Sequence, residues 1–393
     1  MKILSVNAGS SSLKFQMYEM PEEKVLISGV FERIGLDTGM YTIKINGEKI
    51  KKECKLENHS VAVEILIKEL LENNVISSLD EIKGVGHRLV HGGEKYASSV
   101  VIDDDVIKTV DELSELAPLH NPANLIGVKA FMERIPNALQ VGCFDTAFHQ
   151  TMKEEEFLYP VPYEWYEKYG VRKYGFHGMS HNYIANRMME ILNNPNAKII
   201  SCHIGNGGSI CAIKDGKSID TSMGFTPNAG LMMGSRSGGI DATLIPYVMQ
   251  KANKTMEEVF EDLNKHSGYL GVSGISSDSR DIEEAIEEGN ERAILSQNIY
   301  VHKIANYIAR YYIELNGADA IVFTAGVGEN SASTRKEIID RLSALGIKID
   351  DERNNVRGKE ALISTDDSKV KVYVIPTDEE VMIARDTYKF INE

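Results

Sequence analysis

Five segments of the chain place a histidine, arginine or aspartate beside glycine, proline or aromatic residues, as loops do where they hold polar side chains at a binding site. These segments are Gly86–Gly93, Ala117–Pro122, Cys143–His149, Tyr174–Gly178 and Met233–Gly239. Two of the segments carry an arginine, Arg88 and Arg236. A planar guanidinium binds a carboxylate or phosphate through two parallel hydrogen bonds and keeps its proton. The chemistry that these residue types indicate is the binding of anions.

Metal binding by histidines and hydrolytic chemistry are both disfavoured by spacing. His87 and His91 would share one face of a helix, but the glycines around them favour a strand. Four residues of a strand span roughly 13 Å, which is too far for two ligands of one ion. The chain has no GxSxG motif, so a Ser–His–Asp hydrolase is not supported. For each single histidine, a hydrogen-bonded structural role is the simpler interpretation.

Two tight turns of small residues, Ala8–Ser12 and Gly205–Ser209, could hold phosphate. Their successive backbone N–H groups can form an anion-binding concavity, and the lack of bulky side chains lets a phosphate approach closely. A third glycine-rich segment, Gly326–Asn330, is not a dinucleotide GxGxxG motif because position 331 is serine, and the chain has no GxxxxGK[ST] motif. One such turn alone is more often only a turn, but the three together favour nucleotide binding.

Each of the two tight turns joins two predicted strands. The first pair is expected over residues 2–7 and 13–18, and the second over 197–204 and 210–213. Asp215-Gly216 is typical of a hairpin and leads to a further strand over 217–221. Hairpins of the same kind at the head of two halves suggest an ancient duplication, and a spacing of roughly two hundred residues is that of a domain repeat.

Helical patterns separate these strands. Apolar residues follow helical spacing behind Ser180, which we expect to be the N-cap of its helix. A longer helix is expected over 291–315, closing at Asn316-Gly317, and a short buried strand over 320–324 leads into a glycine-rich turn. The alternation of helices with short apolar strands predicts an α/β fold with sheets covered by helices.

The composition excludes several classes of function. The chain has 393 residues, 42% hydrophobic and 26% charged, which is ordinary for a globular protein and enough for two domains. Its formal net charge of −15 makes nucleic acid and anionic membrane surfaces poor partners. No apolar run approaches the ~18 residues of a spanning helix, no signal peptide is recognisable, and the four cysteines lack CxxC spacing. We therefore expect a soluble, cytoplasmic protein.

Eight ordered motifs of the chain resemble those of the acetate kinase family, which belongs to the actin-like ATPase superfamily. They are Val6–Lys14, His87–Gly93, Phe144–His149, Arg172–Gly178, His203–Gly207, Ser276–Arg280, Gly326–Asn330 and Ile375–Glu380. The resemblance implies the two-domain actin-like fold of acetate and sugar kinases, with duplicated mixed-sheet cores and a central cleft. The N-terminal domain would comprise residues 1–147 plus 381–393. The C-terminal domain, residues 148–380, would carry the adenosine site.

The resemblance also implies an activity: reversible, direct in-line transfer of the γ-phosphoryl group of ATP to acetate, giving acetyl phosphate and ADP. Mg²⁺ would assist, Mn²⁺ could substitute for it, and the protein would usually be a homodimer. A carboxylate with a pKa near ~4–5 is already the nucleophile at neutral pH, so no general base is needed. Such a reaction needs positioning and charge stabilisation instead.

The same resemblance assigns roles to single residues. Arg88 and Arg236 would flank the acetate and the transferred phosphoryl group. His177 would donate to the equatorial oxygens of that group, and Asp145 would orient the centre and Mg²⁺. Magnesium would be held, mostly through waters, by Asn7 and Glu379.

Two further sets of residues follow from the motifs. The slot for the acetate methyl group would be formed by Val90, Leu119, Phe176 and Pro227, although core packing explains these four residues equally well. The nucleotide would be bound by Lys14, His203, Ile204, Gly205, Asn206, Gly207, Asp278, Ser279, Arg280, Gly326, Val327, Gly328, Glu329 and Asn330. One extra methylene changes discrimination by only ~1–3 kcal/mol, so propionate would be a poorer substrate but not an excluded one.

The chain departs from the family pattern around Arg236. Gly239 and Ala242 replace the usual acid and proline, which leaves the partner of Arg236 open, and Gly208 replaces the usual serine or alanine.

A propionate or other short-chain acyl kinase is the nearest alternative. A sugar kinase, with Asp145 as the base, and a non-catalytic actin-like nucleotide switch are more remote. The switch would explain the two hairpins, but not two arginines and three histidines around an apolar slot.

Overall fold

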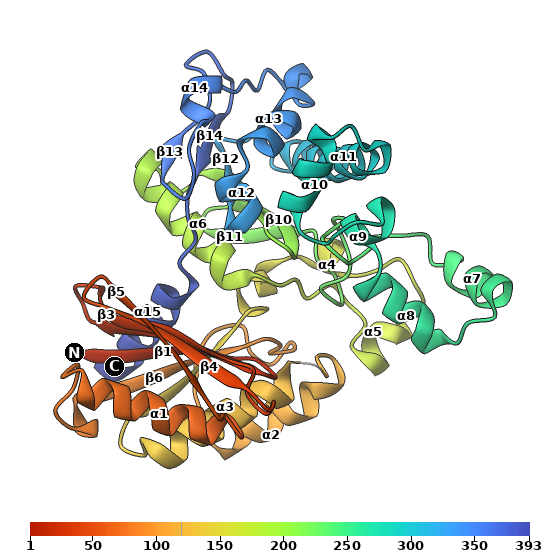
Figure 1. Ribbon diagram of the computed structural model, residues 1–393. Helices are drawn as coiled ribbons and strands as arrows, with labels where there is room; N and C mark the ends of the chain where they lie inside the picture. The colour runs from red at the N-terminus through yellow and green to blue at the C-terminus, as the bar shows by residue number, and fades with distance from the viewer. Residues whose placement is uncertain (119) are drawn as a thin grey trace. The chain divides into compact units, whose positions relative to one another are not determined.

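The computed structural model describes residues 1–118 and 120–393. The chain divides into two compact units, one formed by Met1–Phe148 with Asp378–Glu393 and the other by His149–Thr377. The boundaries predicted from the sequence, 147/148 and 380/381, lie close to these. The C-terminal helix, blue in Figure 1, therefore belongs to the same unit as the red and orange strands at the start of the chain.

The first unit is built on a mixed sheet. Its strands are β1 (Lys2–Ala8), β2 (Ser12–Glu19), β3 (Lys24–Glu32), β4 (Gly39–Ile45), β5 (Glu48–Cys54), β6 (Ile82–Leu89), β7 (Val100–Val101) and β8 (Leu139–Phe144). Its helices are α1 (His59–Glu72), α2 (Asp104–Glu112), α3 (Asn121–Arg134) and α15 (Glu379–Asn392). The strand order is β5-β4-β3-β2-β1-β6-β8-β7. Strands β1 to β5 form an antiparallel meander, whereas β1, β6 and β8 are parallel neighbours.

Helix α15 packs against β1, β6 and β8, and glycines on β6 allow its close approach. A Cβ atom on Gly84 would come within 2.6 Å of the side chain of Thr387, and one on Gly86 would collide with Thr387 and Ile383. Real Cβ atoms are not found at such distances, so only glycine fits here. This packing brings the start of α15, far along the sequence, to the sheet of the first unit.

The second unit has its own mixed sheet with strand order β11-β10-β9-β12-β14-β13. The strands are β9 (Lys198–Ile204), β10 (Gly208–Lys214), β11 (Lys217–Thr221), β12 (Ala320–Thr324), β13 (Ala361–Leu362) and β14 (Lys371–Val374). The helices up to α9 are α4 (Glu154–Phe157), α5 (Glu164–Tyr169), α6 (Gly178–Leu192), α7 (Leu244–Ala252), α8 (Met256–Lys265) and α9 (Gly268–Ser273). They are followed by α10 (Ser279–Glu287), α11 (Glu291–Glu314), α12 (Ala325–Asn330), α13 (Ala332–Asp340) and α14 (Asp351–Asn354). Strands β9, β12 and β14 are buried, parallel neighbours.

The two sheets share one topology. In each, an antiparallel run of three strands leads into two further strands parallel to the first, giving β3-β2-β1-β6-β8 in one unit and β11-β10-β9-β12-β14 in the other. The predicted α/β fold class with duplicated mixed-sheet cores is confirmed. Each core also begins with the predicted hairpin of small residues, because β1 pairs with β2 and β9 pairs with β10.

Two local predictions are wrong. Ser180 is not an N-cap: α6 begins at Gly178 with His177 at the cap position, and the Ser180 hydroxyl instead lies 2.8 Å from His203 Nδ1. The glycine-rich segment after β12 is not a turn but the short helix α12. In both cases the local propensity for a cap or a turn is overridden by tertiary packing.

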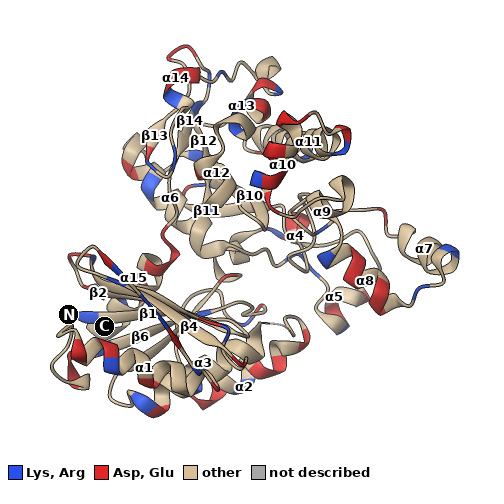
Figure 2. Ribbon diagram, viewed as in Figure 1, with Lys and Arg blue, Asp and Glu red and all other residues tan. Residues whose placement is uncertain are grey.

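Charged residues are distributed along the chain in both units (Figure 2), and Asp and Glu outnumber Lys and Arg by 58 to 43. Among the helices of residues 1–118 and 120–393, none is both long and apolar enough to cross a membrane.

Candidate active site

In the first unit, three predicted residues meet where the parallel strands end. Asn7 lies near the end of β1, Arg88 near the end of β6, and Asp145 directly after β8. Arg88 Nε lies 3.2 Å from Asp145 Oδ1, Arg88 Nη2 pairs with Asp145 Oδ2, and Arg88 Nη1 lies 3.3 Å from Asn7 Oδ1. Since the carboxyl ends of parallel strands share one edge of a sheet, residues separated widely in sequence form one polar cluster there.

Glu379, the first residue of α15, joins this cluster electrostatically. Burial raises the pKa of Glu379, the Arg88 guanidinium opposes that rise, and the Asp145 and Glu380 carboxylates add to it. Burial alone would lower the pKa of Arg88, but Asp145 and Glu379 raise it above its ordinary value. Lys14 forms an ion pair with Glu380. The cluster therefore holds carboxylates in excess of its cations, with oxygen donors of the kind that Mg²⁺ and Mn²⁺ prefer.

The predicted acyl-slot residues are divided between the units. Val90 follows β6 directly and is 4% exposed, and its backbone N–H donates to Asn124 Oδ1 at 3.1 Å. Phe176 and Pro227 belong to the second unit, and Leu119 lies outside the described residues. The slot stays a prediction.

In the second unit, the hairpin between β9 and β10 carries the predicted phosphate turn. Gly205 N–H donates to Gly207 C=O at 3.0 Å, which closes the turn. The Asn206 carbonyl accepts a hydrogen bond of 3.0 Å from Gly234 N–H. A Cβ atom on Gly234 would overlap the side-chain oxygen of Asn206, so a glycine is required for the 233–239 loop to lie against this turn.

Arg236 in that loop has no acidic partner among the described residues. Its Nη1 lies 3.5 Å from the Pro227 carbonyl oxygen and 3.9 Å from Met233 Sδ. Burial lowers the pKa of Arg236. Arg236 is therefore held by neutral groups, with no acidic side chain of the described residues to compensate its charge.

His177 approaches the same glycine turn. It caps α6 in the left-handed conformation, with φ of 58°, and its Nδ1 lies 2.9 Å from Ser209 Oγ. Its Nε2 lies 3.9 Å from the position of a Cβ atom on Gly207, and Arg236 Nη1 lies 3.6 Å from that position. The ring stacks on that of His203, with centroids 4.0 Å apart. The structure thus brings His177, Arg236, His203 and Gly207 together.

A cavity of about 620 Å³ opens beside this turn within the second unit. Predicted nucleotide-binding residues that line it are Gly205, Asn206, Asp278, Ser279, Arg280, Gly326, Val327 and Asn330. At its edge Asp278 caps α10, and Arg280 lowers the pKa of Asp278 to about 2 by direct hydrogen bonding. The volume and the mixture of backbone and polar side-chain groups suit a small-molecule ligand.

Other predicted nucleotide-binding residues lie elsewhere. Ile204 is buried in the core, Gly328 is buried, and Lys14 belongs to the first unit. The Glu329 carboxylate accepts hydrogen bonds from the backbone N–H groups of Ala325, at 2.7 Å, and Thr377, at 3.2 Å, so it braces α12.

Sequence reasoning missed several residues at this cavity. Tyr269, Glu283, Ser331 and Arg357 line it but belong to no predicted site. Arg357 is followed by Gly358, and this pairing of a charged residue with glycine is the signal that marked the five segments with candidate site residues. The same signal could have identified Arg357. Ser331 directly follows the Gly326–Asn330 motif, whereas Tyr269 and Glu283 belong to other elements and carry no such signal.

Arg335 was also missed, although it is fully buried. Its Nη1 donates to the Gly328 carbonyl at 2.9 Å, its Nε to Asn354 Oδ1 at 2.8 Å, and its Nη2 to the Val356 carbonyl at 2.9 Å. It therefore ties α12 to the segment that carries Arg357.

Comparison with known proteins supports one interpretation of this geometry. The model of the acetokinase family matches residues 2–385. An acetate kinase of Geobacillus sp. (strain WCH70) is 57% identical over 393 residues, which cover 100% of this chain and 99% of that protein. The crystal structure of Porphyromonas gingivalis acetate kinase is 47% identical, with a TM-score of 0.94 and 100% of both chains covered. The crystal structure of a propionate kinase from Francisella tularensis subsp. tularensis SCHU S4 is 40% identical, with a TM-score of 0.93 and 99% of both chains covered. The resemblance stated from sequence motifs and the fold class it implied are confirmed.

Proposed function

The chain belongs to the acetokinase family, and from this membership we propose that it transfers the γ-phosphoryl group of ATP reversibly to acetate, giving acetyl phosphate and ADP. One observation carries the proposal. Arg236 keeps a partly buried charge without an acidic partner, and its Nη1 and the Nε2 of His177 both lie near Gly207 of a glycine turn that borders the cavity. A partly buried cation without an anionic partner reduces the stability of the fold, and a bound anion removes that penalty. This part of the second unit is therefore suited to a phosphoryl group.

The acceptor needs no base, because acetate is ionised at neutral pH. The task of the side chains is to reduce the repulsion between two anions and to hold them in line. In our proposal Arg88 binds the acetate carboxylate, while Arg236 and His177 donate hydrogen bonds to the transferred phosphoryl group. Asp145 fixes the orientation of Arg88 through the two hydrogen bonds that join them.

The first unit offers a fitting site for a divalent cation. Asn7, Asp145 and Glu379 present oxygen donors, and burial raises the pKa of Glu379, with the Asp145 and Glu380 carboxylates adding to the rise. We propose that Asn7 and Glu379 hold the ion, largely through its waters, and that Asp145 orients it. When bound, Mg²⁺ or Mn²⁺ would neutralise charge on the phosphates.

The nucleotide would occupy the cavity of the second unit. Its phosphates would meet the backbone N–H groups of the Gly205–Gly207 turn, and its adenosine would lie toward Asp278, Ser279 and Arg280 on one side and Gly326 and Val327 on the other.

Because ATP is the co-substrate, we expect the protein to work in the cytoplasm. We also propose a homodimer, which light scattering after size exclusion would test.

The test is a direct assay of acetyl phosphate with purified protein, MgATP and acetate, beside reactions with glycerol and with no acceptor. Phosphorylation of acetate alone supports the proposal. Transfer to glycerol would make the protein a sugar-type kinase, and ATP binding without transfer to either acceptor would make it a nucleotide switch.

Propionate is a second candidate acceptor, and the full-length likeness to a propionate kinase favours including it. The two acids differ by one methylene, which is worth ~1–3 kcal/mol of discrimination. We expect a higher kcat/KM for acetate, and a higher value for propionate in the same assay would reverse the assignment.

A further inference from the structure

A layer of histidines and serines lies between α6 and the sheet of the second unit. Ser201 and His203 are two residues apart on β9 and therefore point to the same face, and Ser209 on β10 is paired with His203 across the hairpin. His177 caps α6 and His181 follows it by one turn, with the His181 backbone N–H donating to the His177 backbone carbonyl at 3.0 Å. The helix thus presents two imidazoles to a sheet face that carries hydroxyl groups.

Four of these side chains form a continuous hydrogen-bonded chain. Ser201 Oγ lies 2.8 Å from His181 Nδ1, His181 Nε2 lies 2.8 Å from Ser209 Oγ, and Ser209 Oγ lies 2.9 Å from His177 Nδ1. Ser201, His181 and Ser209 are fully buried. The fourth member, His177, directs its other nitrogen, Nε2, toward Gly207.

Each hydroxyl and each neutral imidazole has a single proton to donate, so a serine that donates to one ring can only accept from the other. If Ser209 donates to His177 Nδ1, a neutral His177 carries its proton on Nε2. Ser209 must then accept from His181 Nε2–H, and His181 Nδ1 must accept from Ser201. In the opposite direction His177 would carry its proton on Nδ1, and its Nε2 would repel an anion.

We propose that Ser209 and His181 are positioning residues for His177: the chain of hydrogen bonds from Ser201 holds the ring and keeps the His177 proton on Nε2, facing the phosphoryl group. The inference rests on the proposed function for the identity of that anion. Neither Ser209 nor His181 touches the anion in this proposal. They act only through the orientation and tautomer of His177.

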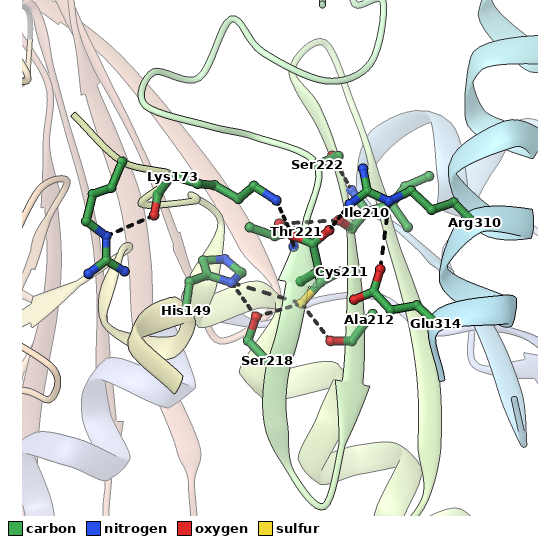
Figure 3. Close-up of polar contacts among 12 residues, drawn as sticks. His149, Lys173, Ile210, Cys211, Ala212, Ser218, Thr221, Ser222, Arg310 and Glu314 are labelled. Atoms are coloured by element: carbon green, nitrogen blue, oxygen red, sulfur yellow. Dashed lines mark hydrogen bonds and ion pairs between the residues drawn. The ribbon is translucent and has the colours of Figure 1, made fainter. Parts of the chain in front are cut away.

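The surroundings of His181 favour the neutral form of its ring, which can orient Ser209 and His177 without carrying a charge. Burial lowers the pKa of His181 well below its ordinary value, and His149 and His203 lower it further. His149 is itself anchored, since its Nδ1 lies 2.8 Å from Ser218 Oγ and its Nε2 lies 2.9 Å from the Phe176 carbonyl oxygen. Figure 3 shows His149 beside Ser218 and Cys211.

The tautomers can be read directly by NMR. Full-length protein labelled with ¹⁵N-histidine is examined in long-range ¹H–¹⁵N spectra at a pH about two units above the ordinary histidine pKa. The signals of His177 and His181 are assigned by their loss in His177→Gln and His181→Gln. We expect the proton on Nε2 in both rings of the wild type, and a mixture of tautomers for His177 in Ser209→Ala. A proton on Nδ1 of either ring in the wild type, or an unchanged His177 in Ser209→Ala, would overturn the proposal.

Kinetics of acetyl phosphate formation supply the second readout. Ser209→Ala should lower kcat about ten- to hundredfold while the KM values for ATP and acetate change less than about twofold. The matched control is Ser296→Ala, which removes a fully buried serine whose hydroxyl bonds only the Ala293 carbonyl of its own helix, and it should keep wild-type kcat. Equal kcat in Ser209→Ala and Ser296→Ala would contradict the positioning role.

A pair of substitutions at 181 separates positioning from packing. The amide of His181→Gln can take the place of ring Nε2 and donate to Ser209, whereas the shorter amide of His181→Asn takes the place of Nδ1 and reaches only Ser201. Both remove the ring, so a merely structural role predicts similar losses. We expect kcat within about threefold of wild type for Gln and more than about tenfold below it for Asn. Equal losses would contradict the proposal, and this pair decides it even if Ser209→Ala fails to fold.

The tests also separate this proposal from the proposed function. A wild-type protein that forms no acetyl phosphate disproves the function, while the NMR spectra still show whether the chain sets the His177 tautomer. A wild-type enzyme with unaffected variants disproves only the positioning role.

Discussion

The two units share a sheet topology, but Arg88 in the first and Arg236 in the second have opposite electrostatic surroundings. In the first unit Arg88 lies at the edge where parallel strands end, bound to Asp145 and Asn7. In the second unit Arg236 comes from a loop after β11 and is held by the Pro227 carbonyl and the Met233 sulfur. The pKa of Arg88 is raised by its acidic neighbours, whereas that of Arg236 is lowered by burial. A duplicated scaffold has thus produced one compensated and one uncompensated cation.

Each unit also contains a cluster of acidic side chains. In the first unit Asp145, Glu379 and Glu380 outnumber the cations near them. In the second, Glu156, Asp220 and Glu314 also lie close together, but Lys173 and Arg310 both form ion pairs with the buried Asp220. Arg310 also faces Glu314, at 3.7 Å (Figure 3). In both clusters the carboxylates thus outnumber the cations, and in the second the two cations both pair with Asp220.

The largest expected effect comes from removing the uncompensated cation. Arg236→Ala should lower kcat/KM for acetyl phosphate formation by about a thousandfold, because a charge partner of the transition state is worth several kcal/mol. Its melting temperature should stay equal to that of the wild type or rise, since no acid loses a partner. Arg88→Ala should lose activity similarly but melt at a lower temperature, because Asp145 keeps a buried charge without its cation.

The control for both is Arg187→Ala, which removes a half-buried arginine paired with Glu360 and should leave activity unchanged. Near-wild-type rates in either arginine variant would contradict the site. A clear drop in the melting temperature of Arg236→Ala would show that its charge is compensated in the folded chain, against the contrast drawn between the two units.

Asp145→Asn tests whether the first cluster recruits a metal ion. The substitution keeps the volume and removes one negative charge, so the magnesium concentration for half-maximal rate should rise about tenfold or more. Titration of the rate with MgCl₂ at saturating ATP measures this effect. A general base at Asp145 would instead give a loss that no magnesium concentration relieves, and an unchanged magnesium dependence would remove Asp145 from the metal site.

How much could be predicted from sequence depended on the range of the interaction. The strands at 2–7 and 320–324 were predictable because continuous apolar runs are local signals. The N-cap at Ser180 was predicted wrongly because its hydroxyl binds His203, which belongs to another element. The Ser201–His181–Ser209 chain has no sequence signature, since its members meet only when a helix packs on a sheet.

Glu314→Gln probes the acidic cluster of the second unit through the pH dependence of stability. Burial raises the pKa of Glu314 to about 7, and the Asp220 and Glu156 carboxylates add to the rise. Between the ordinary glutamate pKa and about 7, the folded chain holds a proton that the unfolded chain has released, so the free energy of unfolding falls as pH increases through this range. Removing the titrating group should flatten this fall, by about 3 kcal/mol across the range.

Denaturant unfolding at a series of pH values measures the slope in wild type and variant. Glu287→Gln, which changes an exposed glutamate at the end of α10, is the matched control and should keep the wild-type slope. If the variant of Glu314 also keeps that slope, Lys173 and Arg310 compensate this carboxylate fully as well.

The smallest expected effect concerns the acyl slot. It tests whether the first unit contacts the alkyl group of the acceptor as well as its carboxylate. Val90 follows β6 directly, two residues after Arg88, and we propose that it contacts the methyl group of the acceptor whose carboxylate Arg88 binds. Val90→Ala should raise the ratio of kcat/KM for propionate over acetate roughly five- to tenfold, an effect of about 1 kcal/mol. The control is Val85→Ala, an equally truncated buried valine on β6, which should leave the ratio unchanged. An unchanged ratio in Val90→Ala would make Val90 a core residue and move selection of the acyl group to other side chains.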